Sequence, residues 1–236
     1  MSEASRPRTE NQILGALPPE DRERIAAHLE PVELPHGHVI YHVDQQMEHV
    51  YFPTNSMVSL VSQLSDGTSI EVGVTGFEGM VGLPVMLGVD RSPHECITQI
   101  NDGAMRAKAD SIRSEFKRGG ALQDLLLRYS QSLMLTVSQV AACNRVHTVG
   151  ERLARWLLMS YDRCPISELP LTQDFLAIML GTRRAGVTEA AVILQAEGVI
   201  NYRRGRITIT DREGLEETAC ECYKIIKAEF DRLPGQ

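Results

Sequence analysis

The sequence predicts an α+β protein in which a β-rich N-terminal part, a long helix and a C-terminal helix-turn-helix with a β-hairpin follow one another. Three observations predict this order. Apolar residues alternate with period two around Asp66-Gly67, they recur every three or four residues from Leu122 onward, and arginines punctuated by glycines gather in residues 176–209. At 236 residues the chain is long enough for two modest domains, each with its own core.

The composition sets the broad class of the protein. With 43% hydrophobic and 23% charged residues, the chain is typical of soluble globular proteins. Residues 1–12 lack the apolar h-region of a secretory signal, and the uncharged run from Tyr129 to Asn144 is too short and too polar for a membrane span. We therefore expect a cytoplasmic protein without a membrane partner.

Residues 32–110 are expected to form strands. Apolar residues with near period-two spacing flank the Asp66-Gly67 pair, which is a strong hairpin signal. Glycines and prolines punctuate the other short apolar runs, and an antiparallel β-sandwich or barrel follows. A short helix over residues 17–29 is expected before it, with prolines near its N-terminal end.

A long helix follows, with a 4,3,4,3 spacing that suits a seam with a parallel partner helix. The residues of this predicted dimer interface are Leu122, Leu126, Tyr129, Leu133, Thr136, Val140 and Cys143. The alternative is that the same face packs against the chain's own domains. The dimer is favoured because the opposite face of the helix is neither strongly apolar nor short, and the three heptads just reach the length typical of coiled coils.

The segment after residue 170 predicts a helix-turn-helix. Thr172 can cap a first helix that stops at Gly181, and Thr182 can cap a second helix that ends at Gly198. The second helix places one apolar face toward the core, formed by Val187, Ala190, Ala191 and Leu194. Its opposite face is therefore free to contact a ligand.

That outward face and the following hairpin, residues 199–209, predict a DNA-binding surface. Side chains near the N-terminus of such a helix reach base edges in the major groove, and arginines at a hairpin tip contact phosphates. The candidate residues are Thr172, Gln173, Arg183, Arg184, Thr188, Glu189, Arg203, Arg204 and Arg206. A solvated arginine surface used for protein contacts is the alternative. The net charge of −7 disfavours indiscriminate binding to polyanions, so we expect docking through this local basic face.

With these elements in order, the chain resembles the Crp/Fnr superfamily of bacterial transcription regulators. The resemblance extends from about residue 12 to residue 236 and is most specific in residues 169–209 and in ERLARWLLM, residues 151–159. It implies a double-stranded β-helix (jelly-roll, cyclic-nucleotide-binding-like) sensory domain over residues 1–118, a dimerisation helix over 119–145 and a winged helix-turn-helix over 146–236. It also implies a homodimer that binds palindromic double-stranded DNA and contacts RNA polymerase. It leaves open whether a small-molecule effector exists and what it is. Of the family's recognition-helix pattern, only Arg184 is retained.

The expected sensory pocket departs from that of relatives that bind cyclic AMP. Met80 stands where those relatives carry a glutamate that accepts a hydrogen bond from the ribose, although Arg91 and Ser92 remain in sequence. We therefore expect no binding of cyclic AMP and interpret Arg91-Ser92 as a surface turn. The candidate effector-contacting residues are Arg91, Ser92, Thr136 and Ser138.

No metal and no cofactor are expected. The five cysteines contain no CxxC pair, and the first is Cys96, so the N-terminal cysteines that hold an iron-sulfur cluster in the oxygen-sensing branch are missing. The N-terminal histidines, His28, His36, His38, His42 and His49, are interpreted as polar loop residues rather than a metal or haem site. Cys220 and Cys222 are expected on one final helix, residues 213–230, where their side chains point about 200° apart.

Other functions remain as alternatives. A regulator of the same architecture that responds to a cyclic nucleotide, or to redox state through Cys143 or Cys220 and Cys222, is the nearest. An enzyme with a DNA-binding appendage and a nucleotide-binding module that acts through protein partners are more distant, because no phosphate loop, Ser-His-Asp order or paired metal motif occurs in the sequence. We therefore expect a protein that is not an enzyme.

Overall fold

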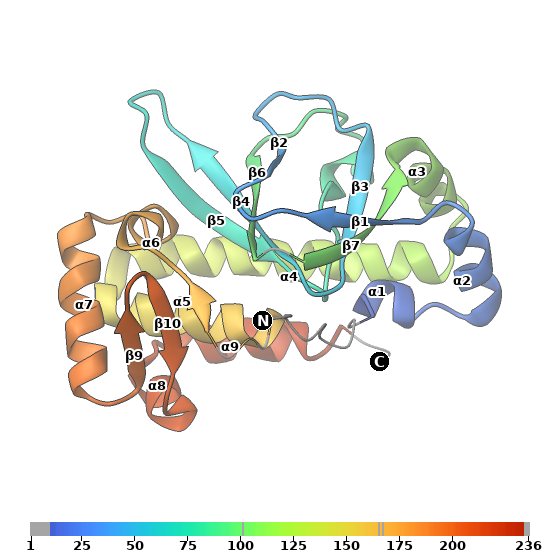
Figure 1. The fold of residues 1–236 in the computed structure, drawn as a ribbon. Helices are drawn as coiled ribbons and strands as arrows, with labels where there is room; N and C mark the ends of the chain where they lie inside the picture. The colour runs from blue at the N-terminus through green and yellow to red at the C-terminus, as the bar shows by residue number, and fades with distance from the viewer. Residues whose placement is uncertain (1–9, 101, 165, 167, 234–236) are drawn as a thin grey trace, which may run out of the picture.

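The computed structural model of the chain describes residues 10–100, 102–164, 166 and 168–233. The predicted α+β arrangement is confirmed: two small sheets lie on one side of a long helix, α4 (Ala121–Val146), and other helices cover its remaining length (Figure 1). No helix among the described residues combines the length and the hydropathy of a membrane span. Residues 1–9, where we expect no secretory signal, lie outside this description.

Two antiparallel sheets form the N-terminal domain, and neither closes into a barrel among the described strands. The first has the order β1 (Glu30–Leu34), β7 (Asp102–Lys108), β3 (His49–Pro53), and the second has the order β2 (Val39–Tyr41), β6 (Glu95–Ile100), β4 (Met57–Gln63), β5 (Ser69–Thr75). The predicted hairpin at Asp66-Gly67 joins β4 to β5, and Gly67 adopts a φ of 85° that a side chain would disfavour. Of the two predicted architectures, the two-sheet one is correct.

Short helices flank this domain and complete its core. They are α1 (Gln12–Gly15), α2 (Pro19–Ala26), the 3₁₀ turn η1 (Leu83–Val85) and α3 (Ala109–Lys117). The helix expected over residues 17–29 is α2, which is shorter at both ends. It begins at Pro19, where the missing N–H of proline leaves no hydrogen bond unmade.

The predicted dimer seam on α4 is wrong, because those side chains are buried within the chain itself. α4 packs against α1, α3, β5 and the C-terminal helix α9 (Cys222–Phe230). Most of the seven predicted interface residues are almost fully covered: Leu122 2%, Leu126 0%, Tyr129 0%, Thr136 0%, Val140 9% and Cys143 0% exposed, while Leu133 is partly buried. The alternative interpretation of the heptad pattern, packing against the chain's own domains, is therefore the correct one.

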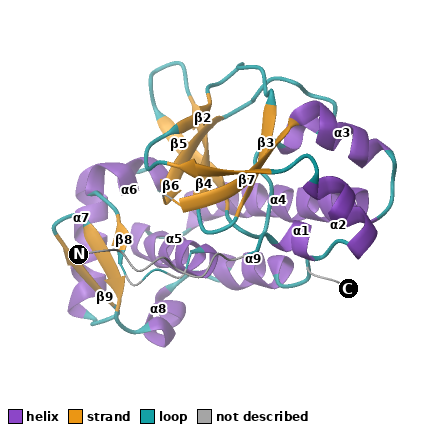
Figure 2. Cartoon of the chain, turned by 45° about the vertical axis from the view of Figure 1, so that its right-hand side comes forward, coloured by secondary structure: helices purple, strands orange, loops and turns teal. Residues whose placement is uncertain are grey.

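The C-terminal part begins with α5 (Val149–Arg163), which lies beside α4 and α9 below the sheets (Figure 2). Thr148 starts the helix with a capping box, since its hydroxyl accepts from the Glu151 N–H while the Glu151 carboxylate accepts from the Thr148 N–H. The single final helix expected over residues 213–230 is wrong. It is two helices, α8 (Arg212–Thr218) and α9, separated by residues 219–221, of which Ala219 is extended.

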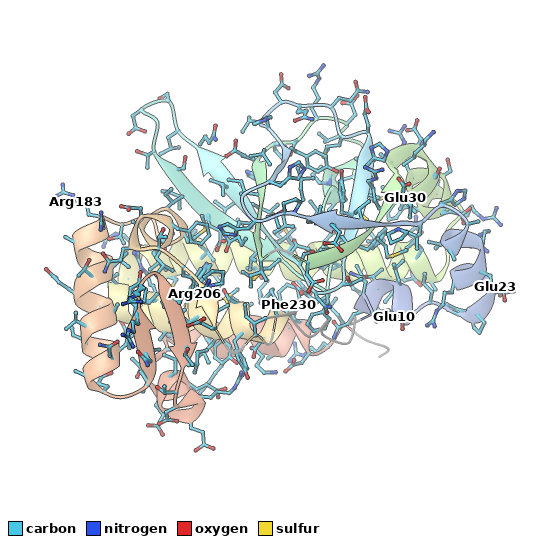
Figure 3. The ribbon with its side chains drawn as sticks, in the orientation of Figure 1. Glu10, Glu23, Glu30, Arg183, Arg206 and Phe230 are labelled. Atoms are coloured by element: carbon cyan, nitrogen blue, oxygen red, sulfur yellow. The ribbon has the colours of Figure 1, made fainter. Side chains whose placement is uncertain are left out.

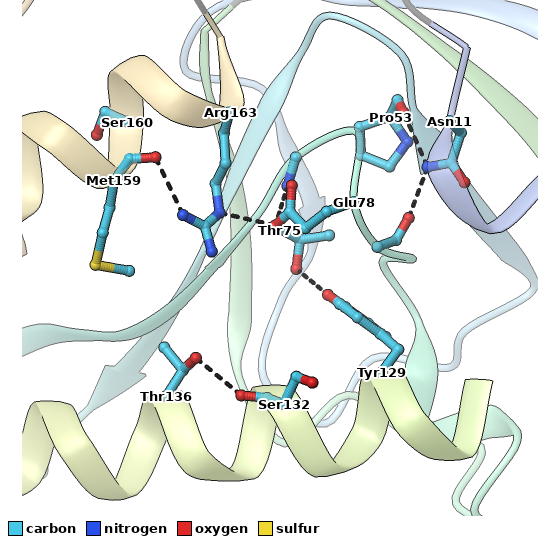
Figure 4. Close-up of polar contacts among 12 residues, drawn as sticks. Asn11, Pro53, Thr75, Glu78, Tyr129, Ser132, Thr136, Met159, Ser160 and Arg163 are labelled. Atoms are coloured by element: carbon cyan, nitrogen blue, oxygen red, sulfur yellow. Dashed lines mark hydrogen bonds and ion pairs between the residues drawn. The ribbon is translucent and has the colours of Figure 1, made fainter. Parts of the chain in front are cut away.

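Buried polar contacts attach α5 to the second sheet. Trp156 donates from Nε1 to a Glu71 carboxylate oxygen at 2.7 Å, and Arg163 donates to Glu78 at 2.7 Å. The Glu78–Arg163 ion pair lies beside the Thr75–Tyr129 hydrogen bond that joins β5 to α4 (Figure 4). Removing one partner of a buried polar pair is costly, because the other partner is then left buried without a hydrogen bond. These contacts therefore hold the C-terminal part on the sheet.

Glu71 makes the stability of this junction depend on pH. Burial raises the pKa of Glu71 to about 7, although hydrogen bonds from Ser59 and Trp156 partly oppose the rise. The folded chain therefore binds this proton more tightly than the unfolded chain does, and the resulting stabilisation is lost as the pH rises from about 4.5 to 7. The loss amounts to at most about 3 kcal/mol.

We expect the Glu71→Gln variant, which carries no titrating group at this position, to lack this loss. The free energy of unfolding, measured by urea denaturation at a series of pH values, should fall less steeply for the variant than for the parent between about pH 5 and 7. Glu33→Gln, at an exposed glutamate of β1, is the matched control and should keep the parental slope. Equal slopes for the parent and Glu71→Gln would contradict the assignment.

The packing of α4 on the sheet domain depends on close contact between Tyr129 and Gly79. The Tyr129 ring lies directly over Gly79, so a Cβ at Gly79 would overlap the ring. Gly79→Ala should lower the free energy of unfolding by about 1 to 3 kcal/mol. Gly150→Ala is the control, because its Cβ would meet only the Thr148 hydroxyl at 4.0 Å and the position lies in the first turn of α5. That variant should be as stable as the parent or slightly more stable.

Candidate nucleic-acid interface

The predicted helix-turn-helix consists of α6 (Gln173–Met179) and α7 (Arg184–Ala196). Thr172 caps α6 as expected, accepting from the Phe175 N–H at 3.2 Å. Gly181 makes the turn with a φ of 55°. The predicted capping role of Thr182 is wrong by one residue: Arg183 is the N-cap of α7, and it makes no side-chain cap hydrogen bond. The Thr182 N–H donates to the Ala177 carbonyl at 3.0 Å and so belongs to the turn that closes α6.

The two faces of α7 are as the apolar spacing predicts. Val187, Ala190, Ala191 and Leu194 are at most 5% exposed and pack into the core. Arg184 and Glu189 are exposed on the other face, and Thr188 is partly exposed, with its hydroxyl bonded to the Arg184 carbonyl at 3.0 Å. Arg183 projects from the end of α7 into solvent (Figure 3).

The predicted wing is a hairpin of β9 (Ile200–Arg203) and β10 (Arg206–Ile209), extended by the short strand β8 (Leu169–Pro170). Arg204 and Gly205 form its tip with φ values of 51° and 73°. Positive φ at both central residues is the backbone that matches strand twist in two-residue hairpins. The turn leaves Arg203, Arg204 and Arg206 exposed on one edge.

The start of α6, the start of α7 and the wing meet around one shallow depression. Its lining residues are Thr172, Gln173, Asp174, Arg184, Tyr202, Arg204 and Gly205. Thus Thr172, Gln173, Arg184 and Arg204, four of the predicted residues, are brought together from three elements. Arg183 instead lines a neighbouring depression that it shares with the β4–β5 turn at Gly67 to Ser69.

Two arginines of this surface have acidic partners within the chain. Arg184 lies 3.4 Å from Asp174, and Arg206 lies 3.2 Å from Glu168. All four side chains are about half exposed or more, and such ion pairs contribute only about 0 to 1 kcal/mol. Both arginines can therefore exchange these carboxylates for phosphates or base edges at little cost.

Tyr202 belongs to this surface, although it is not among the residues predicted from the sequence. Its hydroxyl donates to the Leu171 carbonyl at 3.1 Å, and its N–H donates to Gln195 at 2.7 Å. Tyr202 thereby joins the wing to α7 and to the residue that precedes the cap of α6. Its position between exposed Asn201 and Arg203 in a period-two strand is the signal that could have indicated an inward side chain.

The candidate effector residues do not gather in one place. A pocket of about 450 Å³ lies between α4 and the sheet domain, and its lining, which includes Met80, Leu83, Leu127, Leu133 and Met134, is mainly apolar. Ser92 lines this pocket, whereas Arg91, Thr136 and Ser138 are not among its lining residues.

Arg91 forms the surface contact expected of a turn: its side chain is 56% exposed and donates to the Asp44 carbonyl at 2.6 Å. Thr136 is buried and donates to the Ser132 carbonyl within α4 (Figure 4). Ser138 donates to the Met134 carbonyl. The side chains of Arg91, Thr136 and Ser138 therefore do not line the pocket.

The C-terminal region matches the model of the Crp-like helix-turn-helix domain over residues 151–218. No curated protein sequence matches the chain.

Solved structures show the same fold over most of this chain. FixK2 from Bradyrhizobium japonicum is 17% identical with a TM-score of 0.70, and the match covers 81% of this chain and 98% of FixK2. A putative transcriptional regulator of the Crp/Fnr family from Eubacterium rectale is 17% identical with a TM-score of 0.68, covering 87% of this chain and 96% of that one. A CRP-family transcriptional regulator from Thermus thermophilus is 17% identical with a TM-score of 0.67, covering 80% and 96%. The predicted resemblance is confirmed: the chain has the fold of the Crp/Fnr superfamily.

Proposed function

We propose that the chain is a homodimeric, sequence-specific DNA-binding transcription regulator that contacts RNA polymerase and responds to an apolar small molecule. The observation that supports DNA recognition most directly is the exposed arginine surface, in which the N-terminus of α7 and the wing tip share one face of a Crp-like domain.

Within this proposal the side chains have two kinds of role. Arg184, Thr188 and Glu189 on α7 contact base edges in the major groove, where arginine pairs with guanine and glutamate accepts from the cytosine amino group. Arg203, Arg204 and Arg206 contact phosphates, as do Thr172, Gln173 and Arg183. Phosphate contacts set affinity and position, whereas base contacts set specificity.

The dimer is proposed to form through a different stripe of α4 from the one predicted from the sequence. Exposed residues recur along α4 with 4,3,4,3,4 spacing, and they are Leu127, Gln131, Met134, Ser138, Ala141 and Arg145. This stripe has the heptad spacing of a coiled-coil seam but lies five residues further along than the buried one. Leu127 is 48% and Met134 59% exposed, so the chain itself leaves apolar surface for a partner helix to cover.

The effector is proposed to bind in the pocket beside this stripe. Leu127, Gln131 and Met134 line the pocket as well as the stripe, so a partner helix would close the pocket on its open side. The apolar lining and the absence of Arg91 from it favour an uncharged apolar ligand over a cyclic phosphate, whose charge needs a cationic partner.

Substitution of single arginines should separate the two roles at the DNA surface. Arg184→Ala is expected to weaken binding to the selected palindromic site by about 1 to 3 kcal/mol and to relax the preference at one base pair of each half-site. Arg203→Ala should weaken binding to all sequences alike and reduce the salt dependence. Fluorescence anisotropy with selected and random duplexes at two salt concentrations measures both. Equal losses from Arg184→Ala on every duplex would contradict base readout.

The oligomeric state tests the proposed interface. The parent should sediment as a dimer, and Met134→Glu should sediment as a monomer, because two facing carboxylates would be desolvated and would repel each other at the seam. Leu64→Glu replaces a similarly exposed apolar residue, 53% exposed and far along the sequence from α4, and should leave the dimer intact. A monomeric parent, or a Met134→Glu protein that remains dimeric, would refute this interface.

A further inference from the structure

Four side chains that bind metals in many proteins meet where α4 ends. Cys143 lies in the last turn of α4 and His147 is its C-cap, so the two share one face of the helix at i, i+4. Cys220 lies in the break between α8 and α9, and Cys222 is the first residue of α9. The ligand atoms of these four residues all lie within 4.8 Å of one another.

The break between α8 and α9 creates this arrangement. On one continuous helix Cys220 and Cys222 would point to different sides. The extended conformation of Ala219, at φ −68° and ψ 144°, turns the chain so that both sulfurs face the end of α4. The three cysteines are at most 4% exposed and form a cluster separate from the main hydrophobic core, and His147 is partly buried beside them.

Two of the distances between these ligand atoms match the edges of a tetrahedral zinc site, and none of the six exceeds 4.8 Å. A tetrahedron with Zn–S bonds near 2.3 Å and a Zn–N bond near 2.0 Å has S–S edges of about 3.8 Å and S–N edges of about 3.5 Å. The Cys143 and Cys220 sulfurs are 3.5 Å apart, and the Cys222 sulfur is 3.6 Å from Nδ1 of His147. Both values fall within a few tenths of an ångström of those edges.

The surroundings also suit a metal. The Nε2 atom of His147 lies 3.1 Å from the Glu221 carboxylate, the contact that orients most metal-binding histidines through their second nitrogen. Gln139 donates to the Cys222 sulfur at 3.3 Å. Arg152 and Arg155 of α5 are buried and interact electrostatically with this cluster, which would offset the net negative charge of three thiolates around one divalent ion.

Neither packing nor a disulfide accounts for all four groups. Buried cysteines commonly pack as small apolar residues, but packing does not require an imidazole nitrogen to face a sulfur or a carboxylate to hold the far side of that ring. A Cys143–Cys220 disulfide would use two sulfurs and leave Cys222 and His147 without a role. The three cysteines of the cluster are free thiols in the structure.

We propose that Cys143, His147, Cys220 and Cys222 form a Cys₃His site for a structural Zn²⁺ ion that ties the end of α4 to α9. Four protein ligands leave no open coordination position, which is the arrangement of structural rather than catalytic zinc. This proposal replaces our expectation that the chain binds no metal. It stands on the cluster alone and does not depend on the proposed DNA binding.

Metal content of the full-length, tag-free protein tests the site directly. After purification with a reducing agent and without chelators, mass spectrometry of metals should find roughly one zinc per chain. His147→Gln and Cys222→Ser should each lose most of it, whereas His147→Cys, which supplies a fourth thiolate, should retain it. Cys96→Ser is the control, because Cys96 is a buried cysteine in β6, far from the cluster in sequence and in a different domain, and its zinc content should equal that of the parent.

Two further measurements separate metal binding from a failure to fold. Cobalt added to the chelator-treated parent should give the intense visible absorption of tetrahedral thiolate-bound Co²⁺, and His147→Gln should not give it. Chelation should lower the melting temperature of the parent but not that of His147→Gln, since a ligand that binds only the folded state stabilises it. Parent protein that contains no zinc and takes up none from excess Zn²⁺, or zinc content that is the same in the parent, His147→Gln and Cys222→Ser, would overturn the proposal. Iron in place of zinc, or a Cys143–Cys220 disulfide in freshly purified protein, would also overturn it.

Discussion

Both halves of the chain pack on the same face of α4, and this packing decides which surfaces remain available for function. Tyr129 is fully buried between Gly79 of the sheet domain and Phe230 of α9, and Thr136 and Cys143 continue that buried face toward the C-terminal end. A helix covered on this side by its own chain can meet a partner only on the other side. The exposed stripe from Leu127 to Arg145 lies there, and the apolar pocket opens beside it.

The position of the DNA-binding surface follows from the polar contacts between α5 and the sheet. Glu71 lies on β5 and Glu78 lies shortly after it. They accept hydrogen bonds from Trp156 and Arg163 of α5, and both carboxyl groups are buried, where an unpaired carboxylate would be costly. Because α5 packs against α7, the recognition helix is placed relative to the sheet domain by the same contacts. A shift of α5 along β5 would therefore alter the spacing of two recognition helices in the proposed dimer, although no base-contacting residue would itself change.

Local signals made most of the helix-turn-helix and wing predictable from the sequence, and non-local packing limited the rest. The cap at Thr172, the turn at Gly181 and the apolar spacing from Val187 to Leu194 are each encoded within a few residues, and each is confirmed. The seam could not be predicted, because two stripes of α4 carry the same heptad spacing and only tertiary contacts show which one is covered. The cysteine and histidine cluster could not be predicted either, since Cys143 and Cys220 are 77 residues apart and no glycine or proline marks the break at Ala219.

The pocket and the proposed zinc site lie at different points along α4, which gives the helix a means of linking them. A ligand shifts a conformational equilibrium only by as much as its affinity differs between the two states. Met80 of the sheet domain and Met134 of α4 line different walls of the pocket. If α4 moved on the sheet, these walls would move relative to each other, and the affinity of the pocket for a ligand would differ between the two positions of α4. If the zinc ion ties α9 to the end of α4, a movement of α4 would be passed to the C-terminal domain through these two joined helices. Without the ion, the link between α4 and α5 could bend and α9 would not follow α4. The zinc site would then make the long helix and the DNA-binding domain move as one body, and its loss would uncouple the pocket from the recognition helices without changing either.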